Sequence, residues 1–414
     1  MPNPPNTDTE LLPDSPCSPT EFWNRTAQEM QRLEEDSLLR TLRPTELLSA
    51  THLRRNGKTY LHFASNDYLA LAWQQQNDSP HQTLNSKLPH GATASPLVVG
   101  ASLQYEKLCQ TIAHWQNTPA AIVFPSGYST NLGTLRALIS PSDLVLSDEL
   151  NHACIIDACK LSRAKTLVYP HVNTQALEEL LQTHRQRYRM AWILTDSLFS
   201  MHGNPAPIPE IERIAKQYSA LAFADEAHAS GVFGHQGRGL LDLFQADPDV
   251  WIKTGTLSKA IGSIGGFVAG SKLLCQLITQ RARPLIFSTA LPPSILFQAQ
   301  TAITRLASMD QQRSHLYQRS QQLRALLHRL GLHSSNSHPL LHSPIIPIVV
   351  RTPQAALALS KHLESHNIYI PAIRPPTVPK NQSLLRVSLN AHHQEEHLLQ
   401  LEQALQVFPT PLDT

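Results

Sequence analysis

The feature that most constrains this chain is a series of short apolar runs that alternate with stretches of helical spacing. The runs span residues 120–124, 143–147, 166–169, 191–195, 220–225, 250–254 and 266–269. Strands that alternate with helices pack side by side in a mostly parallel sheet with helices on its faces. Ligands of such sheets bind beyond the carboxyl ends of the strands. We therefore predict an α/β fold with a mostly parallel seven-stranded sheet.

The length of 414 residues suits two domains rather than one small core. Residues 1–20, rich in Pro, Asn, Asp and Ser, are predicted to be a disordered tail. Residues 21–60 form the predicted N-terminal arm, with a helix over 21–42 that ends near Pro44. The large domain is expected over 61–300, and a smaller C-terminal α/β domain over 301–414. The elements predicted in that smaller domain are strands over 345–350, 367–372 and 384–389, a helix over 355–364 and a closing helix marked by Leu398, Leu401, Leu405 and Phe408.

Charge and composition exclude several classes of function. The net charge is +2 and the Lys and Arg residues are scattered, so no nucleic-acid or membrane-surface partner is expected. The longest apolar runs are strand-length and too short to cross a bilayer. Five cysteines lack the paired spacing of zinc sites, so we expect no metal and read them as reduced thiols of a cytoplasmic protein.

Two charged residues lie at or beyond the ends of apolar runs. Asp225 closes the run 220–225 within the motif Asp-Glu-Ala-His, and Lys259 follows the run 250–254. Pyridoxal phosphate requires this pair, because a buried Asp keeps the ring nitrogen protonated while a Lys binds the aldehyde. Either residue alone also has an ordinary explanation, since Asp often caps helices and most lysines are solvated.

A third element supports the same cofactor. The run 120–124 leads through Pro125 into Ser126-Gly127-Tyr128, which indicates a strand followed by the first turn of a helix. Such a helix terminus binds phosphate with its free amides and its positive dipole end. Gly127 permits close approach of an anion, and Tyr128 can lie against a ring. The three elements together predict a site for pyridoxal 5′-phosphate.

From about Arg40 to the C-terminal helix the chain resembles the α-oxoamine synthases, which are fold-type I pyridoxal-phosphate-dependent transferases. Within that family it is most similar to the 8-amino-7-oxononanoate synthases of biotin synthesis. The motifs that carry the resemblance are Phe-Ala-Ser-Asn-Asp-Tyr-Leu at 63–69, Ser-Gly-Tyr at 126–128, Asn-His-Ala at 151–153, Phe-Ser-Met at 199–201, Asp-Glu-Ala-His at 225–228, Gly-Arg-Gly at 237–239, Thr-Leu-Ser-Lys at 256–259, Phe-Ser-Thr at 287–289 and Ala-Ile-Arg-Pro-Pro-Thr-Val-Pro at 372–379.

The resemblance implies roles for individual residues. Lys259, His152, Asp225 and His228 are expected to be catalytic, with His152 stacked on the cofactor ring and His228 bonded to its phenolic oxygen. The cofactor-binding positions are Ser126, Gly127, Tyr128, His152, Ser200, Asp225, His228, Thr256, Lys259 and Thr289. Thr289 would reach the cofactor phosphate of a neighbouring subunit, which implies a homodimer with the active site at its interface. His152 also has a purely structural interpretation, as the cap of the helix that follows it.

Five further positions resemble substrate contacts: Arg40, Asn66, Arg374, Thr377 and Arg386. Asn66 and Arg386 would bind the carboxylate of the amino acid, and Arg40 and Thr377 the acyl substrate. Arg386 lies in an apolar strand, where it needs a carboxylate partner, and that partner could also be a protein Asp or Glu. Arg40 could equally be solvated, and Thr377 could only shape a turn.

The implied reaction is the condensation of L-alanine with pimeloyl-CoA or pimeloyl-acyl carrier protein. The alternatives are a sister enzyme that condenses glycine with a short acyl-CoA, and a catalytically silent subunit, against which Lys259 argues. A nicotinamide-binding oxidoreductase would need a glycine fingerprint that this chain lacks. Residues 91–100 and Tyr105 depart from the family pattern, so acyl-chain preference is left open, as is the choice between coenzyme A and carrier protein.

Overall fold

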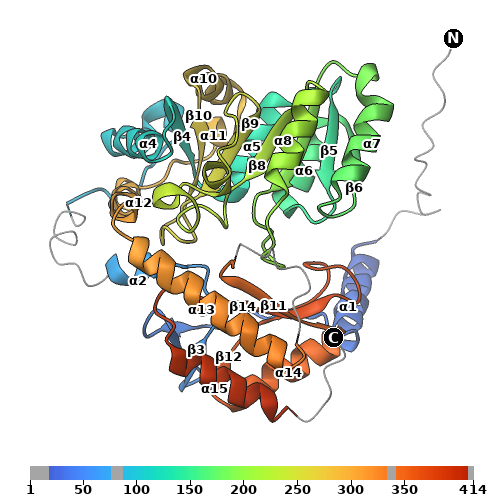
Figure 1. Ribbon diagram of the computed structural model, residues 1–414, viewed down its shortest axis with the longest axis vertical. Coiled ribbons are helices and arrows are strands. Elements are labelled where there is room, and N and C mark those ends of the chain that lie inside the picture. Colours follow the sequence, from blue (N-terminus) through green and yellow to red (C-terminus); the bar gives the residue numbers. More distant parts are fainter. Residues whose placement is uncertain (1–17, 76–86, 333–341, 409–414) are drawn as a thin grey trace.

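The computed structural model describes residues 18–75, 87–332 and 342–408. Residues 1–17, most of the predicted tail, lie outside the described part. Within it, the strands form three sheets of seven, four and three strands. In Figure 1 the seven-stranded sheet and its helices lie above, and the two smaller sheets lie below. No helix among the described residues is long and apolar enough to cross a bilayer.

The seven-stranded sheet is mostly parallel, as predicted. Its strands in spatial order are β4 (Ala120–Phe124), β10 (Gly266–Gly270), β9 (Trp251–Thr256), β8 (Leu221–Asp225), β7 (Ala191–Asp196), β5 (Leu144–Asp148) and β6 (Lys165–Tyr169). Only β10 runs antiparallel to its two neighbours. Every residue of β5 and β7 is buried, because side chains on both faces of a parallel sheet meet helices.

Helices cover both faces of this sheet. The helices of the large domain are α2 (Leu71–Gln75), α4 (Leu103–Trp115), α5 (Gly127–Leu138), α6 (Ala153–Ser162), α7 (Thr174–His184), α8 (Ile208–Gln217), α9 (Leu240–Leu243), α10 (Lys272–Arg281), α11 (Arg283–Phe287) and α12 (Pro293–Leu306). Apolar side chains of α5 and α6 pack with Trp192 and Phe223 on one face. Apolar side chains of α4, α7, α8 and α12 belong to the larger core on the other face. The sheet is therefore packed between two apolar layers of helices. The edge at which the parallel strands end is not covered by these layers and can hold polar residues.

The smaller unit contains the other two sheets. Its elements are β1 (Glu46–Leu47), β2 (His52–Arg55), β3 (Lys58–His62), α13 (Asp310–Arg329), β11 (Ile345–Arg351), α14 (Pro353–Ser365), β12 (Ile368–Tyr369), β13 (Ala372–Ile373), β14 (Ser383–Ser388) and α15 (Glu395–Gln406). Strand β14 pairs with β11 and β13, and β3 pairs with β12 in parallel. Residues from both ends of the chain therefore build this unit together.

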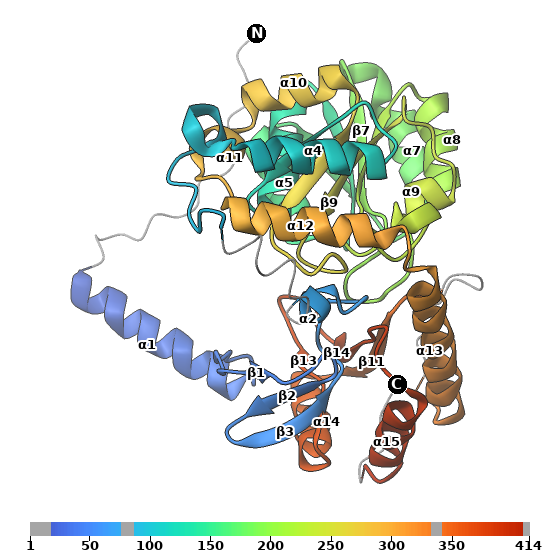
Figure 2. The same cartoon turned by 90° about the vertical axis from the view of Figure 1, so that its left-hand side faces the viewer.

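Two predictions about elements are wrong. The arm helix α1 (Pro19–Glu35) ends at Glu35 rather than at residue 42, and the chain then turns through Ser37, which has a positive φ. The single strand predicted over 367–372 is two strands in different sheets, β12 and β13. Helix α1 buries none of its residues, and Figure 2 shows it projecting from the body of the molecule. The proposed domain limits remain predictions.

Candidate active site

The carboxyl ends of the central strands surround a cavity of about 230 Å³. All but one of the predicted cofactor-binding residues line it: Ser126, Gly127, Tyr128, His152, Ser200, Asp225, His228, Thr256 and Lys259. The same cavity is lined by residues that we did not single out, among them Asn131, Cys154 and Asp196. Thr289 does not line it, and its side chain is exposed.

The first turn of α5 forms one wall of the cavity. Ser126 is the N-cap, and its hydroxyl accepts the amide of Ser129, whose own hydroxyl accepts the amide of Ser126. The amides of Gly127 and Tyr128 lie before the first intrahelical bond, so the helix offers them no acceptor. A Cβ on Gly127 would lie 3.0 Å from Oγ1 of Thr256, which shows how closely β9 approaches this turn. The turn can therefore bind a phosphate with two amides and the Thr256 hydroxyl.

Asp225 ends β8 and is held as a carboxylate acceptor. Its Oδ1 accepts the amide of Ala227 at 2.9 Å, and its Oδ2 accepts from Nδ2 of Asn131 at 2.6 Å. The amide of Asn131 is itself oriented by Thr254, whose hydroxyl donates to Oδ1 of Asn131 at 2.6 Å. Two donors thus fix the carboxylate in position at the cavity wall. Asn131 lies one turn after Gly127 on α5, which was the available sequence signal.

Lys259 and His228 both line the cavity and contact each other. The Nζ atom of Lys259 lies 2.8 Å from Nε2 of His228. Burial lowers the pKa of Lys259 to about 8, although Asp225 acts in the opposite direction. Burial, followed by the charge of Lys259, lowers the pKa of His228 well below its ordinary value, so this histidine is neutral. A lysine with a lowered pKa is a better nucleophile and base near neutral pH.

His152 caps a helix and also lines the cavity, so its position is compatible with both interpretations that the sequence left open. It is the N-cap of α6, where its Nδ1 accepts the amide of Cys154 at 3.3 Å. Its ring also lines the cavity, 6.2 Å from the ring of Tyr128 in an edge-to-face arrangement. Burial lowers the pKa of His152, which favours the neutral ring expected of a residue that stacks on an aromatic cofactor. The cap therefore fixes the ring at the cavity wall, and its stacking on a cofactor stays a prediction.

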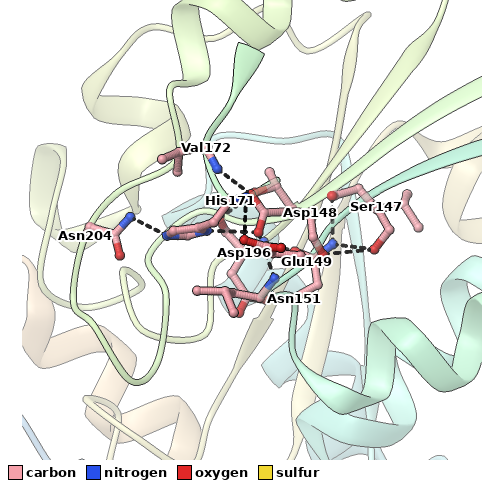
Figure 3. Close-up of polar contacts among 11 residues, drawn as sticks. Ser147, Asp148, Glu149, Asn151, His171, Val172, Asp196 and Asn204 are labelled. Carbon is pink, nitrogen blue, oxygen red and sulfur yellow. Dashed lines mark hydrogen bonds and ion pairs between the residues drawn. The ribbon is translucent and has the colours of Figure 1, made fainter. Parts of the chain in front are cut away.

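A polar network behind the cavity fixes the loops that carry these residues (Figure 3). Asn151 accepts the amide of Asp196 at 3.0 Å and donates to the carbonyl of Leu194 at 2.8 Å, which ties the residue before His152 to β7. His171 bonds Asp148 through Nδ1 and Asn204 through Nε2, both at 2.9 Å. Asn204 belongs to the loop that contains Ser200, so this network holds that loop against β5.

Arg386 lies on β14 with only 6 % of its surface exposed. Its guanidinium donates to the carbonyl of Ser200 at 2.6 Å, to Oδ1 of Asn66 at 2.9 Å and to the hydroxyl of Tyr68 at 3.2 Å. All three acceptors are neutral, and no Asp or Glu of the described residues forms an ion pair with Arg386. The structure thus brings Arg386, Asn66 and Ser200 together, and it leaves the guanidinium charge for an external anion.

The other predicted substrate contacts form a separate cluster at the arm. Arg40 donates to the carbonyl of Pro375 at 2.8 Å. Arg374 donates to the carbonyls of Ser37 and Leu39. Thr377 is exposed, and its amide closes a turn onto the carbonyl of Arg374. These residues do not line the 230 Å³ cavity.

These residues fit pyridoxal 5′-phosphate. The cavity offers a helix N-terminus for a phosphate, a buried carboxylate held by two donors for a ring nitrogen, and an amine of lowered pKa for an aldehyde. The carboxylate and the amine come from two neighbouring strands, β8 and β9, and the phosphate wall comes from the helix after β4. Each feature matches one functional group of that cofactor.

The fold and the cavity define a transferase of the pyridoxal-phosphate-dependent fold class. The chain belongs to the family described as aminotransferase class I and II, whose model matches residues 58–405. It is 38% identical to the 8-amino-7-oxononanoate synthase of Hydrogenovibrio crunogenus, with 92% of this chain and 95% of the relative covered. Among solved structures, the 8-amino-7-oxononanoate synthase of Francisella tularensis has a TM-score of 0.72 at 27% identity, covering 84% and 96% of the two chains. The serine palmitoyltransferase of Sphingomonas wittichii has a TM-score of 0.85 at 26% identity, covering 94% and 96%.

Proposed function

We propose that this protein condenses L-alanine with a pimeloyl thioester to give 8-amino-7-oxononanoate, carbon dioxide and free coenzyme A or acyl carrier protein. The proposal rests mainly on Arg386, a buried cation beside the cofactor cavity. All of the hydrogen-bond acceptors described around Arg386 are neutral. A buried guanidinium needs an anion, and the carboxylate of an amino acid supplies one. The relatives named 8-amino-7-oxononanoate synthase support the choice of alanine and pimeloyl thioester.

The residues of the cavity would divide the chemistry among them. Bound pyridoxal phosphate supplies an electron sink for a carbanion at the substrate Cα. Asp225 would place its negative charge against the ring nitrogen, and His152 and His228, which line the same cavity, would orient the ring. Lys259 would hold the cofactor through its aldehyde and, as the free amine, would accept the Cα proton. Arg386 and Asn66 hold the carboxylate so that the Cα proton faces Lys259.

The bond changes balance without a further reactant. The alanine Cα forms a bond to the thioester carbonyl carbon, and the thiol leaves as coenzyme A or carrier protein. The bond from Cα to the carboxylate then breaks, carbon dioxide leaves, and a proton returns to Cα. Lys259 would hold the cofactor again once the product amine has left.

For the acyl substrate, we propose the cluster of Arg40, Arg374 and Thr377. Two guanidinium groups in this cluster could bind the free carboxylate at the far end of a pimeloyl chain. Arg40 is exposed and Arg374 is partly buried, and both donate to backbone carbonyls that the carboxylate could replace.

The proposal includes a homodimer with the active site at its interface. Thr289 is exposed and does not line its own cavity. It precedes Ala290, whose amide bonds the carbonyl of Ala94 next to an exposed apolar segment, Leu97 to Val99. In the proposed dimer, a second copy would cover this segment, and Thr289 would reach the partner's cavity. The cytoplasmic location expected from the sequence also stays a prediction.

The test is a titration of the cofactor-loaded protein with L-alanine, glycine and L-serine, followed by absorbance spectroscopy. We expect the cofactor band to shift at the lowest concentration with L-alanine. A preference for glycine would favour the sister activity with short acyl-CoA, and a preference for serine would favour a palmitoyltransferase-like activity. A protein that binds no pyridoxal phosphate would contradict the proposal altogether.

A further inference from the structure

A chain of hydrogen bonds joins Arg386 to Lys259 through two buried side chains. Arg386 Nη2 lies 3.2 Å from the hydroxyl oxygen of Tyr68. That oxygen lies 2.6 Å from Nδ1 of His228, and Nε2 of His228 lies 2.8 Å from Nζ of Lys259. Tyr68 is fully buried. The chain thus links the amino-acid carboxylate site to the reactive amine, and Tyr68 is its one member without a role so far.

The direction of the chain is set at its arginine end. A guanidinium can only donate, so the Tyr68 oxygen accepts from Arg386 and must send its single proton elsewhere. Three acceptors are near it: Oδ1 of Asn66 at 3.3 Å, Nδ1 of His228 at 2.6 Å and the hydroxyl of Ser388. Oδ1 of Asn66 also accepts from Arg386 at 2.9 Å, and the Ser388 hydroxyl donates to the carbonyl of Ser65. The short contact with His228 places the Tyr68 proton on the bond to its Nδ1.

The next link follows from the proton count of a neutral histidine. Burial, Lys259 and Arg386 keep the pKa of His228 well below its ordinary value, so its ring carries one proton. If Nδ1 accepts from Tyr68, that proton is on Nε2, which faces Lys259. An Nζ atom that accepts this proton must present a lone pair, whereas an ammonium group has only donors.

We propose that Tyr68 is a positioning residue that fixes the direction of this chain, so that in the cofactor-free protein the bond from His228 favours the neutral form of the Lys259 amine, with its lone pair toward His228. The inference rests on the proposed function only in taking Lys259 as the reactive amine. It assigns to Tyr68 the supply of the neutral amine that captures the cofactor aldehyde, before Nε2 of His228 turns to the phenolic oxygen. Without the Tyr68 hydroxyl, Nε2 of His228 could instead accept from the ammonium form of Lys259.

Other groups around Lys259 act on the same equilibrium. The carboxylates of Asp225 and Asp196 and the thiol of Cys154 favour the ammonium form, while burial and the charge of Arg386 oppose it. His152 and Lys259 also affect each other's charge. Because Tyr68→Phe keeps all of these groups, it separates the hydrogen-bond chain from the electrostatics.

The test measures the proton on Lys259 directly, in the full-length protein after its cofactor has been removed. The protein is treated with trace acetic anhydride over a pH series, and the labelling of Lys259 relative to the exposed Lys107 is read by peptide mass spectrometry. In Tyr68→Phe we expect the midpoint of Lys259 labelling to lie about one pH unit higher than in the wild type. At a pH below that midpoint, this shift corresponds to a roughly tenfold loss of neutral amine. A profile that coincides with the wild type would overturn the proposal.

Tyr169→Phe is the matched control, since it removes a buried hydroxyl that has no hydrogen-bond partner. We expect its Lys259 profile to match the wild type, and an equal shift in both variants would also overturn the proposal. The labelling needs no substrate, so its result is independent of whether alanine and a pimeloyl thioester are the reactants.

The wild-type protein offers a second measurement that no folding defect can affect. With isotope-labelled histidine, a long-range proton–nitrogen spectrum reports which ring nitrogen of His228 carries the proton, and a His228→Asn spectrum assigns the signal. We expect the proton on Nε2. A proton on Nδ1 would reverse the direction of the chain and overturn the role of Tyr68.

Discussion

Three neutral oxygens surround the guanidinium of Arg386, and this arrangement carries the functional argument at the scale of single residues. Burying a charge without a counter-ion is costly, and stability alone would favour an apolar residue on this strand. The carboxylate of an amino-acid substrate repays that cost only when it binds. The sequence already pointed to a carboxylate partner, and the structure leaves the protein Asp or Glu alternative without a candidate among the described residues.

Arg386→Lys should raise the KM for L-alanine by about 10- to 100-fold, because an ammonium cannot reproduce the planar fork that binds a carboxylate with two donors. The turnover number should fall less than the KM rises. Steady-state kinetics over a range of alanine concentrations will show this, with Arg136→Lys on the exposed end of α5 as the control. An unchanged KM would remove Arg386 from the substrate site.

Asp225→Asn should slow turnover by about 10² to 10⁴, since removing the negative partner of a buried pair costs roughly 3–5 kcal/mol. Lys259→Ala should fold and bind pyridoxal phosphate without a covalent bond, and lose essentially all activity. Turnover assays and the cofactor absorbance band measure both effects. Asp249→Asn, at an exposed position, should behave as wild type. Near-normal turnover in either Asp225→Asn or Lys259→Ala would refute its assigned role.

At the scale of elements, the first turn of α5 is the part of the site that depends most on backbone geometry. Gly127→Ala would place a Cβ 3.0 Å from Oγ1 and 3.2 Å from Cβ of Thr256, so the helix terminus and β9 would have to separate. We expect about a tenfold weaker binding of pyridoxal phosphate, measured by fluorescence titration of the cofactor-free protein. Gly91→Ala, where a Cβ meets nothing within 4 Å, should bind normally. Equal affinities in the two variants would argue against a phosphate at this turn.

The strands of the large sheet could be predicted because each is an apolar run closed by polar residues, and β4 matches its prediction residue for residue. The strand predicted over 367–372 failed for a local reason. Pro371 has no amide to donate and interrupts pairing, so β12 and β13 join different sheets. The pairing of β3 with β12 joins two ends of the chain, and no local pattern encodes such a contact.

In the candidate site, too, some residues could be predicted from the local sequence and others depend on contacts made only in the folded chain. The sequence could predict that Asp225, His228 and Lys259 lie together, because they follow strand ends and the carboxyl edge of a parallel sheet gathers such residues. Their roles stay predictions. Tyr68 and Asn131 could not be given roles, because their functions come from contacts with His228 and Asp225 that only the folded chain creates. Thr289 stays a prediction, since its proposed contact lies in a second copy.

At the scale of the whole molecule, consecutive exposed apolar residues form a surface segment that we place in the proposed dimer interface. Leu97, Val98 and Val99 are each more than half exposed, and the carbonyl of Ala94, three residues before them, accepts the amide of Ala290 next to Thr289. Light scattering coupled to size exclusion should give twice the mass of one chain. Val98→Glu should lower that mass or weaken the dimer, whereas Val168→Glu, at another exposed valine on β6, should not. A monomer with full activity would contradict an interfacial active site.

The central claim is tested most directly by incubating the purified protein with pyridoxal phosphate, L-alanine and pimeloyl-CoA and identifying the product by mass spectrometry. The account predicts 8-amino-7-oxononanoate, with one carbon dioxide and one free coenzyme A for each product formed. A protein that binds the cofactor yet forms no carbon–carbon bond between alanine and the pimeloyl group would contradict it.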